Sequence, residues 1–214
     1  MFVAKRMTPN PKTIESSAPV TEAWELMRTY KIRRLPVVDK GNLMGIVSDG
    51  DLRSVSPSTA TSLSIFEMNY LLAKVCIRDI MHKDVVTIDV GATIEEAALT
   101  MSNHNIAGLV VINTSGAVVG IITEKDIFKS FVEVMGLKEG KTRLTFRVTN
   151  QVGVLHDITQ VFKDLNINIG SLATYAIEDG AAEMVIRTNA TDIKTLTERL
   201  AAAGYPPMHI AQIG

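Results

Sequence analysis

Hydrophobic and polar positions follow the same order twice along the first two thirds of the chain. Each copy opens with a short extended segment, at Thr13-Ile14 or Thr87-Ile88, and continues into a segment with apolar residues at helical spacing. Two short apolar strands joined by a glycine-containing turn follow, and then a second helix. We therefore predict two β-α-β-β-α units. The apolar helix positions i, i+3, i+4 and i+7 are Val20, Ala23, Trp24 and Met27 in the first copy and Ile94, Ala97, Ala98 and Met101 in the second.

Residue identities support a true internal repeat. Met7 aligns with Met81, and Thr93 with Glu96 fits a capping box at the start of the second copy's first helix. A single unit would expose one apolar face of its strands, so we expect the two units to pack together about a pseudo-twofold axis. The matched strands are Leu35-Pro36-Val37-Val38-Asp39 with Leu109-Val110-Val111-Ile112-Asn113, and Gly45-Ile46-Val47-Ser48 with Gly120-Ile121-Ile122-Thr123.

Each copy ends its last strand on a hydroxyl residue that is followed three positions later by an aspartate. These pairs are Ser48 with Asp51 and Thr123 with Asp126. A hydroxyl at a strand-to-helix junction lies beside free N–H groups that favour a phosphate. A carboxylate one helical turn later can accept two hydrogen bonds from a ribose diol. The alternative is that the hydroxyls are helix N-caps and the acids lie solvated in a first turn; the matched repetition favours a ligand site.

The pattern changes after Gly140. Alternating residues over 143–149 predict a strand, and apolar positions from Val154 to Leu165 have helical spacing. With the later segments this completes β-α-β-β-α-β, the ferredoxin-like order. The predicted fold class is therefore α+β, with two β-α-β-β-α repeats followed by a ferredoxin-like domain. The later segments are strands at 167–176 and 182–187, a turn at 178–180, a helix at 192–203 and a short final strand.

With these motifs, residues 1–137 resemble a tandem pair of CBS domains, called a Bateman module. The predicted boundaries are 1–58 for repeat 1, 59–75 for a linker and helix, and 76–137 for repeat 2. The resemblance implies that an adenine nucleotide (AMP, ADP, ATP or a related adenosine compound) binds as a regulatory ligand in two clefts, each shared between the repeats. One cleft would join Thr123 and Asp126 to Thr13, Ile32, Arg33 and Arg34, and the other would join Ser48 and Asp51 to Thr87, Ile106, Ala107 and Gly108.

These two clefts differ in charge. Arg33 and Arg34 offer two guanidinium groups to phosphates, whereas Ala107 and Gly108 leave room for an adenine ring but neutralise no charge. We therefore expect polyphosphate nucleotides in the first cleft. The alternative is that both arginines pair with surface acids.

Residues 141–214 resemble an ACT domain, a family of amino-acid-binding regulatory modules. The usual Asp-x-x-Gly-x-Leu motif, often with proline before the glycine, is matched by Asn150-Gln151-Val152-Gly153-Val154-Leu155, in which Asn150 replaces the acid and Val152 the proline. An amino-acid site and a fold kept for dimerisation both stay open. An amino-acid site would be lined by Asn150, Gly153, Val154, Leu155, Asn168 and Ile169.

The order CBS-CBS-ACT resembles the AcuB-type family, which is associated with acetoin utilisation. This resemblance implies a regulatory sensor and suggests acetoin as a pathway context. Because CBS pairs and ACT sheets both commonly associate, it also implies a homodimer.

Composition narrows the function classes. The chain has 22 basic and 23 acidic residues and a formal net charge of -1, so we expect no nucleic-acid partner. It shows no signal-peptide pattern and no apolar run of membrane length, so we expect a cytoplasmic protein without membrane association. Four dispersed histidines predict no metal site. Without a visible nucleophile arrangement, we predict a non-catalytic sensor that has no catalytic cofactor and acts on an unidentified protein; the alternatives are a structural oligomerisation module and an enzyme acting on a nucleotide.

Overall fold

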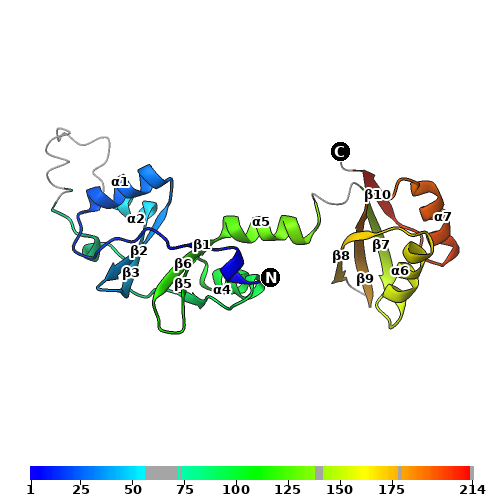
Figure 1. Cartoon of the computed structure of the whole chain (residues 1–214), viewed down its shortest axis with the longest axis horizontal. Helices are drawn as coiled ribbons and strands as arrows, with labels where there is room; N and C mark the ends of the chain where they lie inside the picture. The colour runs from blue at the N-terminus through cyan, green and yellow to red at the C-terminus, as the bar shows by residue number, and fades with distance from the viewer. Residues whose placement is uncertain (56–71, 73, 138–141, 178–179, 213–214) are drawn as a thin grey trace. The chain divides into compact units, whose positions relative to one another are not determined.

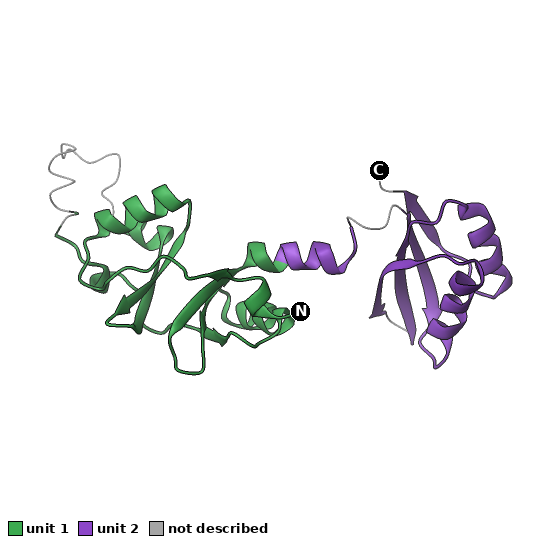
Figure 2. Cartoon of the chain, viewed as in Figure 1, with its two compact units in different colours: residues 1–127 green, residues 128–214 purple. Residues whose placement is uncertain are grey.

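The computed structural model describes residues 1–55, 72, 74–137, 142–177 and 180–212. These residues form two compact units, Met1–Ile127 and Phe128–Gly214 (Figure 2). Most of the predicted linker and helix over 59–75, and residues 178–179 of the predicted turn, lie outside the described residues. Within the described part of the chain, no helix has the length and apolarity needed to cross a membrane.

The first repeat is built on a β-hairpin flanked by two helices (Figure 1). Ile14 makes a single parallel bridge to Val37, so the predicted first strand of this repeat is reduced to one bridge. The reason is that Ser16 turns to the side chain of Asp39, to which its backbone N–H and its hydroxyl both donate. The elements are α1 (Val20–Tyr30), β2 (Arg34–Asp39), β3 (Asn42–Ser48) and α2 (Asp49–Ser54).

The second repeat has the complete predicted order. Its first strand pairs in parallel with the second, and the second pairs antiparallel with the third. Thr93 caps the first helix and exchanges hydrogen bonds with Glu96, which confirms the predicted capping box. The elements are β4 (Thr87–Asp89), α4 (Ile94–His104), β5 (Gly108–Ile112), β6 (Val118–Thr123) and α5 (Glu124–Val134), and short 3-10 turns at Val3–Lys5 and Ile77–Asp79 lie near the N-terminal end of each repeat.

The N-terminal segment of each repeat pairs with the last strand of the other repeat. β1 (Thr8–Pro9) adds to β6, giving the sheet order β1-β6-β5-β4. In the same way, His82 bridges to Ile46 in β3. This reciprocal exchange ties the repeats together through backbone hydrogen bonds.

The exchange explains the glycine that begins each of the two matched segments Gly45–Asp51 and Gly120–Asp126, which we call the signatures of the repeats. A methyl group built on Gly45 would lie 2.7 Å from Met81 Sδ and 2.8 Å from the His82 carbonyl oxygen. A methyl group on Gly120 would collide with Met7 Sδ. Each glycine therefore leaves room for the N-terminal segment of the other repeat, which crosses to pair with its strand and is called the crossing segment below.

Each repeat has its own hydrophobic core, filled by the predicted helix faces. Ala23 and Met27 are buried in the first core, and Ala97 and Met101 are buried in the second. Trp24 is partly buried against the first core. The period of the apolar positions therefore predicted correctly which face of each helix is buried.

The second unit is a four-stranded antiparallel sheet in the order β10-β7-β9-β8, with two helices packed on one face (Figure 1). Its core includes Phe146, Ile158, Phe162 and Ile186. This arrangement confirms the predicted ferredoxin-like fold. The elements are β7 (Thr142–Thr149), α6 (Val154–Asp164), β8 (Ile169–Ala176), β9 (Ala181–Thr188), α7 (Ile193–Ala202) and β10 (His209–Gln212).

Candidate functional site

The two hydroxyl-aspartate pairs form the same local hydrogen bonds. Asp51 Oδ2 accepts from the Ser48 backbone N–H at 2.8 Å and from Ser48 Oγ at 2.6 Å. Asp126 Oδ2 accepts from the Thr123 backbone N–H at 3.0 Å and from Thr123 Oγ1 at 2.8 Å. Ser48 also accepts from the Asp51 backbone N–H, as the N-cap of α2. These residues therefore organise the strand-to-helix junctions, and because each carboxylate oxygen carries two lone pairs, this role is compatible with binding a ligand hydroxyl.

Asp51 has a further partner that the sequence did not predict. His82 Nε2 lies 2.9 Å from Asp51 Oδ1, and the two residues belong to different repeats. Partial burial raises the pKa of Asp51, but the hydrogen bonds from Ser48 and His82 outweigh it and hold the pKa below its usual value. From the sequence, the histidines were considered only as metal ligands. The repeat alignment could have revealed this contact, because it aligns His82 with Thr8. A histidine in one repeat and a threonine in the other make the two clefts different.

Arg34 lies against Gly108 where the two repeats meet. Arg34 Cδ and Nε lie 3.5 and 3.6 Å from the position of a methyl group built on Gly108. Arg34 pairs with Ser48 across β2 and β3, and Gly108 pairs with Thr123 across β5 and β6. The contact thus brings together residues that the sequence assigned to the two different clefts.

The residues before the central strands make matching contacts. The Arg33 carbonyl accepts from the Asp49 N–H at 3.0 Å, and the Ala107 carbonyl accepts from the Glu124 N–H at 3.4 Å. These bonds hold each loop against the start of the signature helix in its own repeat. Ile106 packs against the second core.

Thr13 and Thr87 lie on the opposite side of each central strand from the signature. Thr87 pairs with Val110 in β5, whereas β6, which ends at Thr123, pairs along the other edge of β5. In the first repeat, the segment at Thr13 likewise lies along one edge of β2, because Ile14 bridges to Val37, and β3 pairs along the other edge. Within one repeat, the threonine and the hydroxyl-aspartate pair are thus separated by the central strand.

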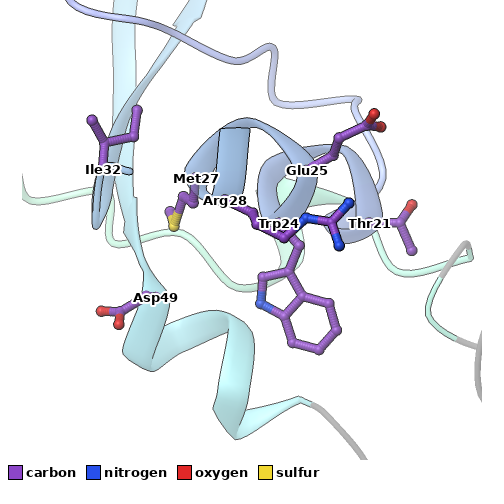
Figure 3. A pocket seen from close by; sticks show the side chains of 7 residues that line it. All are labelled: Thr21, Trp24, Glu25, Met27, Arg28, Ile32 and Asp49. Atoms are coloured by element: carbon purple, nitrogen blue, oxygen red, sulfur yellow. The ribbon is translucent and has the colours of Figure 1, made fainter. Parts of the chain in front are cut away.

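An open pocket of about 720 Å³ adjoins α1 and the start of α2. Figure 3 shows the Trp24 indole extending from α1 toward α2. Ile32 is the one lining residue that the sequence assigned to a cleft, so this pocket was not predicted. Its lining consists of Thr21, Trp24, Glu25, Met27, Arg28, Ile32 and Asp49.

The candidate amino-acid loop in the second unit is mostly exposed. Gly153 has φ +100°, and a methyl group on it would meet open space. The glycine is thus required by its backbone conformation, not by a close approach of another group. Val154 packs into the core, while Asn150 and Leu155 are exposed. Across the sheet, the carbonyl of Asn168 accepts from Thr188 Oγ1 just before Ile169 opens β8.

Among the described residues, no three side chains of histidine, cysteine, aspartate or glutamate lie close enough together to hold a metal ion.

Comparison with curated proteins identifies relatives of the first unit. A CBS domain-containing protein of Dictyostelium discoideum is 30% identical over 136 residues, which cover 63% of this chain and 94% of that protein. Homoserine O-acetyltransferase of Methanocorpusculum labreanum is 33% identical over 133 residues, or 62% of this chain. The match spans 24% of that enzyme's length, so the relative is much longer than the shared part.

Solved structures of CBS pairs resemble the same part of the chain. A putative acetoin utilization protein, AcuB, from Vibrio cholerae is 30% identical with a TM-score of 0.53, covering 65% of this chain and 96% of that one. The CBS pair of protein MJ0100, in complex with 5'-methylthioadenosine and S-adenosyl-L-methionine, is 28% identical with a TM-score of 0.52 and covers 62% of this chain and 97% of that one. CBSX2 in complex with AMP is 26% identical with a TM-score of 0.51 and the same coverage.

Matches to family profiles cover both units. Residues 3–58 and 77–133 match the CBS domain, and residues 142–204 match the ACT domain. The chain therefore belongs to the CBS domain family, as a tandem CBS pair followed by an ACT domain.

Proposed function

We propose that the CBS pair is a non-catalytic regulatory module that binds an adenine nucleotide between its repeats. The similar CBS pair of MJ0100 was solved with two adenosine compounds and that of CBSX2 with AMP. The observation that carries the proposal in this chain is the contact of Arg34 with Gly108, the strand partner of Thr123. This contact supports a cleft that combines the Arg34 guanidinium of repeat 1 with the hydroxyl-aspartate pair of repeat 2.

In the preferred cleft, Asp126 accepts from the ribose diol, and Arg33 and Arg34 neutralise the phosphates. Thr13, Ile32 and Thr123 complete this cleft. The residues assigned to the second cleft include no arginine to neutralise phosphates, and in it Asp51 binds the ribose of an adenosine compound. Its other residues are Ser48, Thr87, Ile106, Ala107 and Gly108.

Regulation follows from the position of the ligand across the repeats. A nucleotide that contacts both repeats stabilises the conformation in which the two repeats are correctly placed for these contacts. Binding therefore increases the population of that conformation. The regulated partner protein binds differently to this arrangement of the two repeats. We place the sensor in the cytoplasm, with acetoin utilisation as its pathway context.

A ligand screen by thermal unfolding tests this function. AMP, ADP, ATP, S-adenosylmethionine and 5'-methylthioadenosine are added in turn, because a ligand present at 100 times its Kd adds about 2.7 kcal/mol to stability. We expect at least one compound to raise the Tm of the full chain. Guanosine and cytidine nucleotides serve as controls. If no adenosine compound shifts the Tm more than these controls do, the proposed function is wrong.

The second candidate function is self-association. Phe128, Phe131 and Val134 lie three residues apart on α5, and their side chains are 68%, 58% and 58% exposed. Such a stripe of large apolar side chains favours a contact with another chain. We propose a homodimer, in which the ACT domain either pairs with its copy or binds an amino acid. Light scattering that shows a monomer at tens of micromolar would contradict the homodimer.

A further inference from the structure

Arg187 is a buried cation on the ACT sheet. Its side chain is in β9 and the residue is 5% exposed. The Nε and Nη1 atoms are buried, and neither has a hydrogen-bond partner among the described residues. A buried charge is normally paired, because an unpaired one loses its hydration without compensation. Within the described part of the chain, no group therefore compensates the loss of hydration at Nε and Nη1 of Arg187.

The neighbours of Arg187 on the sheet do not supply an anion. Arg187 pairs with Arg143 on β7 and with Ser171 on β8, so the three side chains share one face of the sheet. That face is opposite to the one that α6 and α7 cover, since the adjacent Ile186 belongs to the core. Arg143 carries the same charge as Arg187. Ser171 donates its hydroxyl to the Met135 carbonyl at 2.9 Å.

The acid on the same face is too far along the strand. Glu183 is four residues before Arg187, which corresponds to about 13 Å along a strand. Its carboxylate is already bonded to the hydroxyl of Tyr175. Two arginines thus stand side by side at Arg143 and Arg187 without a carboxylate next to them among the described residues.

We propose that this face of the ACT sheet binds the oxyanion group of a small molecule between Arg187 and Arg143. Guanidinium groups donate in a fixed plane and suit carboxylate or phosphate oxygens, and two of them on neighbouring strands match one such group. Binding needs a rotation of the Arg187 side chain, because Nε and Nη1 are covered. The site is distinct from the loop at Asn150, which follows the far end of β7 from Arg143. It does not depend on nucleotide binding by the CBS pair.

NMR spectra of the arginine Nε–H groups in the full chain test the proposal. The Arg187 signal is identified by its loss in Arg187→Met. Sodium acetate and sodium phosphate are titrated separately at constant ionic strength, with sodium chloride as the comparison. We expect the signal to shift saturably with acetate, with phosphate or with both, and not with chloride; the anion that saturates first distinguishes a carboxylate from a phosphate ligand.

Matched variants separate a site from general charge. In Arg187→Met, backbone amides around Ser171 should report binding at least about tenfold weaker, because charge-assisted hydrogen bonds are lost. Arg187→Met should also melt at a higher temperature than the wild type without anion, since it removes an unpaired buried charge. Arg147→Met, which removes an exposed charge from the same face, should bind like the wild type.

Three results would overturn the proposal. The first is the absence of any saturable shift with acetate or phosphate. The second is an equal loss of binding in Arg147→Met, which would mean that the anions respond to net charge. The third is a shift of the Arg187 signal that depends on protein concentration and not on added anion, which would assign the position to an acid of a second copy.

Discussion

His82 Nε2 lies 2.9 Å from Asp51 Oδ1 and joins the segment that opens the second repeat to the helix that closes the first. The matching position in the first repeat is Thr8, which has no imidazole. The two signature aspartates are therefore held differently. A nucleotide that reaches Asp51 has to share or displace this histidine.

The His82–Asp51 contact predicts a specific acid sensitivity. Burial raises the pKa of Asp51 in the folded protein, but hydrogen bonds from Ser48 and His82 lower it by more and hold it below the usual aspartate value of 3.8. A depressed carboxyl pKa contributes stability above pH 3.8 that is lost as the pH falls through the lower folded value. We expect His82→Ala to make the free energy of unfolding fall less steeply below about pH 4. Urea unfolding followed by the fluorescence of Trp24 measures this.

The control for this experiment is His104→Ala. His104 is exposed, and its ring nitrogen contacts the Thr100 carbonyl of its own helix. It should leave the pH dependence unchanged. If His82→Ala and the wild type lose stability in parallel between pH 5 and pH 3, the contact contributes nothing in solution.

The two signature glycines should differ in their tolerance of a methyl group. In Gly45→Ala the new methyl meets the backbone carbonyl of His82 as well as Met81, whereas in Gly120→Ala it meets the flexible Met7 side chain. A backbone carbonyl cannot move without breaking the bridge between Ile46 and His82. We expect both variants to be destabilised, by about 1–3 kcal/mol for overpacking, with Gly45→Ala the worse of the two. Chemical denaturation of each variant measures the difference.

Rescue experiments identify the cause. Shortening Met7 in the Gly120→Ala background should recover part of the loss relative to the same change in the wild type. Shortening Met81 in the Gly45→Ala background should recover less, because the carbonyl contact remains. Equal stabilities of the two glycine variants would show that the crossing segments adapt in the same way.

The fold could be predicted from the sequence because its signals are local. The apolar period fixed the buried faces of α1 and α4, and the capping box at Thr93 fixed a helix start. The roles of Gly45 and His82 could not be predicted in this way. Both depend on a segment of one repeat crossing to the last strand of the other, and a period within one repeat carries no information on that exchange. The first strand of repeat 1 is shorter than predicted because Ser16 bonds to the side chain of Asp39 instead of to the backbone of β2.

Only the local part of the candidate site could be predicted from the sequence. The hydroxyl-aspartate pairs were found because they repeat, and the contact of Arg34 with Gly108 joins residues placed in two separate clefts. Arg187 was predicted only as the last residue of a strand at 182–187. Its burial on the face away from the helices depends on the tertiary structure around the sheet, which the strand prediction does not describe.

The arginines predict a difference between nucleotides and nucleosides. Arg33→Ala combined with Arg34→Ala should weaken ATP binding by about tenfold or more, since charge-assisted hydrogen bonds are worth about 1.5–3 kcal/mol each. Adenosine binding should change much less, because guanidinium groups act on the phosphate charge. Calorimetry with both ligands measures the two losses. Equal losses for ATP and adenosine would point to a disturbed fold or a different pocket.

The ribose contact predicts a loss of discrimination in Asp126→Asn. A carboxylate accepts from both hydroxyls of a ribose diol, whereas an amide keeps one acceptor and turns the other position into a donor. The wild-type protein should therefore prefer a ribonucleotide to the matching 2'-deoxyribonucleotide, because the deoxy compound leaves a polar group unpaired at a cost of about 1–3 kcal/mol. In Asp126→Asn most of this preference should disappear while the fold stays intact. Titration calorimetry with ATP and 2'-deoxy-ATP gives the ratio of affinities.

Asp51→Asn is the matched comparison for this last experiment. Asp51 makes the same bonds to its hydroxyl residue as Asp126 does, but its Oδ1 also contacts His82. Because the ribose would compete with the imidazole there, we expect a smaller change in the ribo-to-deoxy ratio than in Asp126→Asn. Both variants lose a carboxylate from a helix start, so a general effect on the cap would appear equally in each. If neither substitution alters the ratio, the duplicated aspartates hold their strand-to-helix junctions without contacting a ribose, and the nucleotide proposal loses its main support.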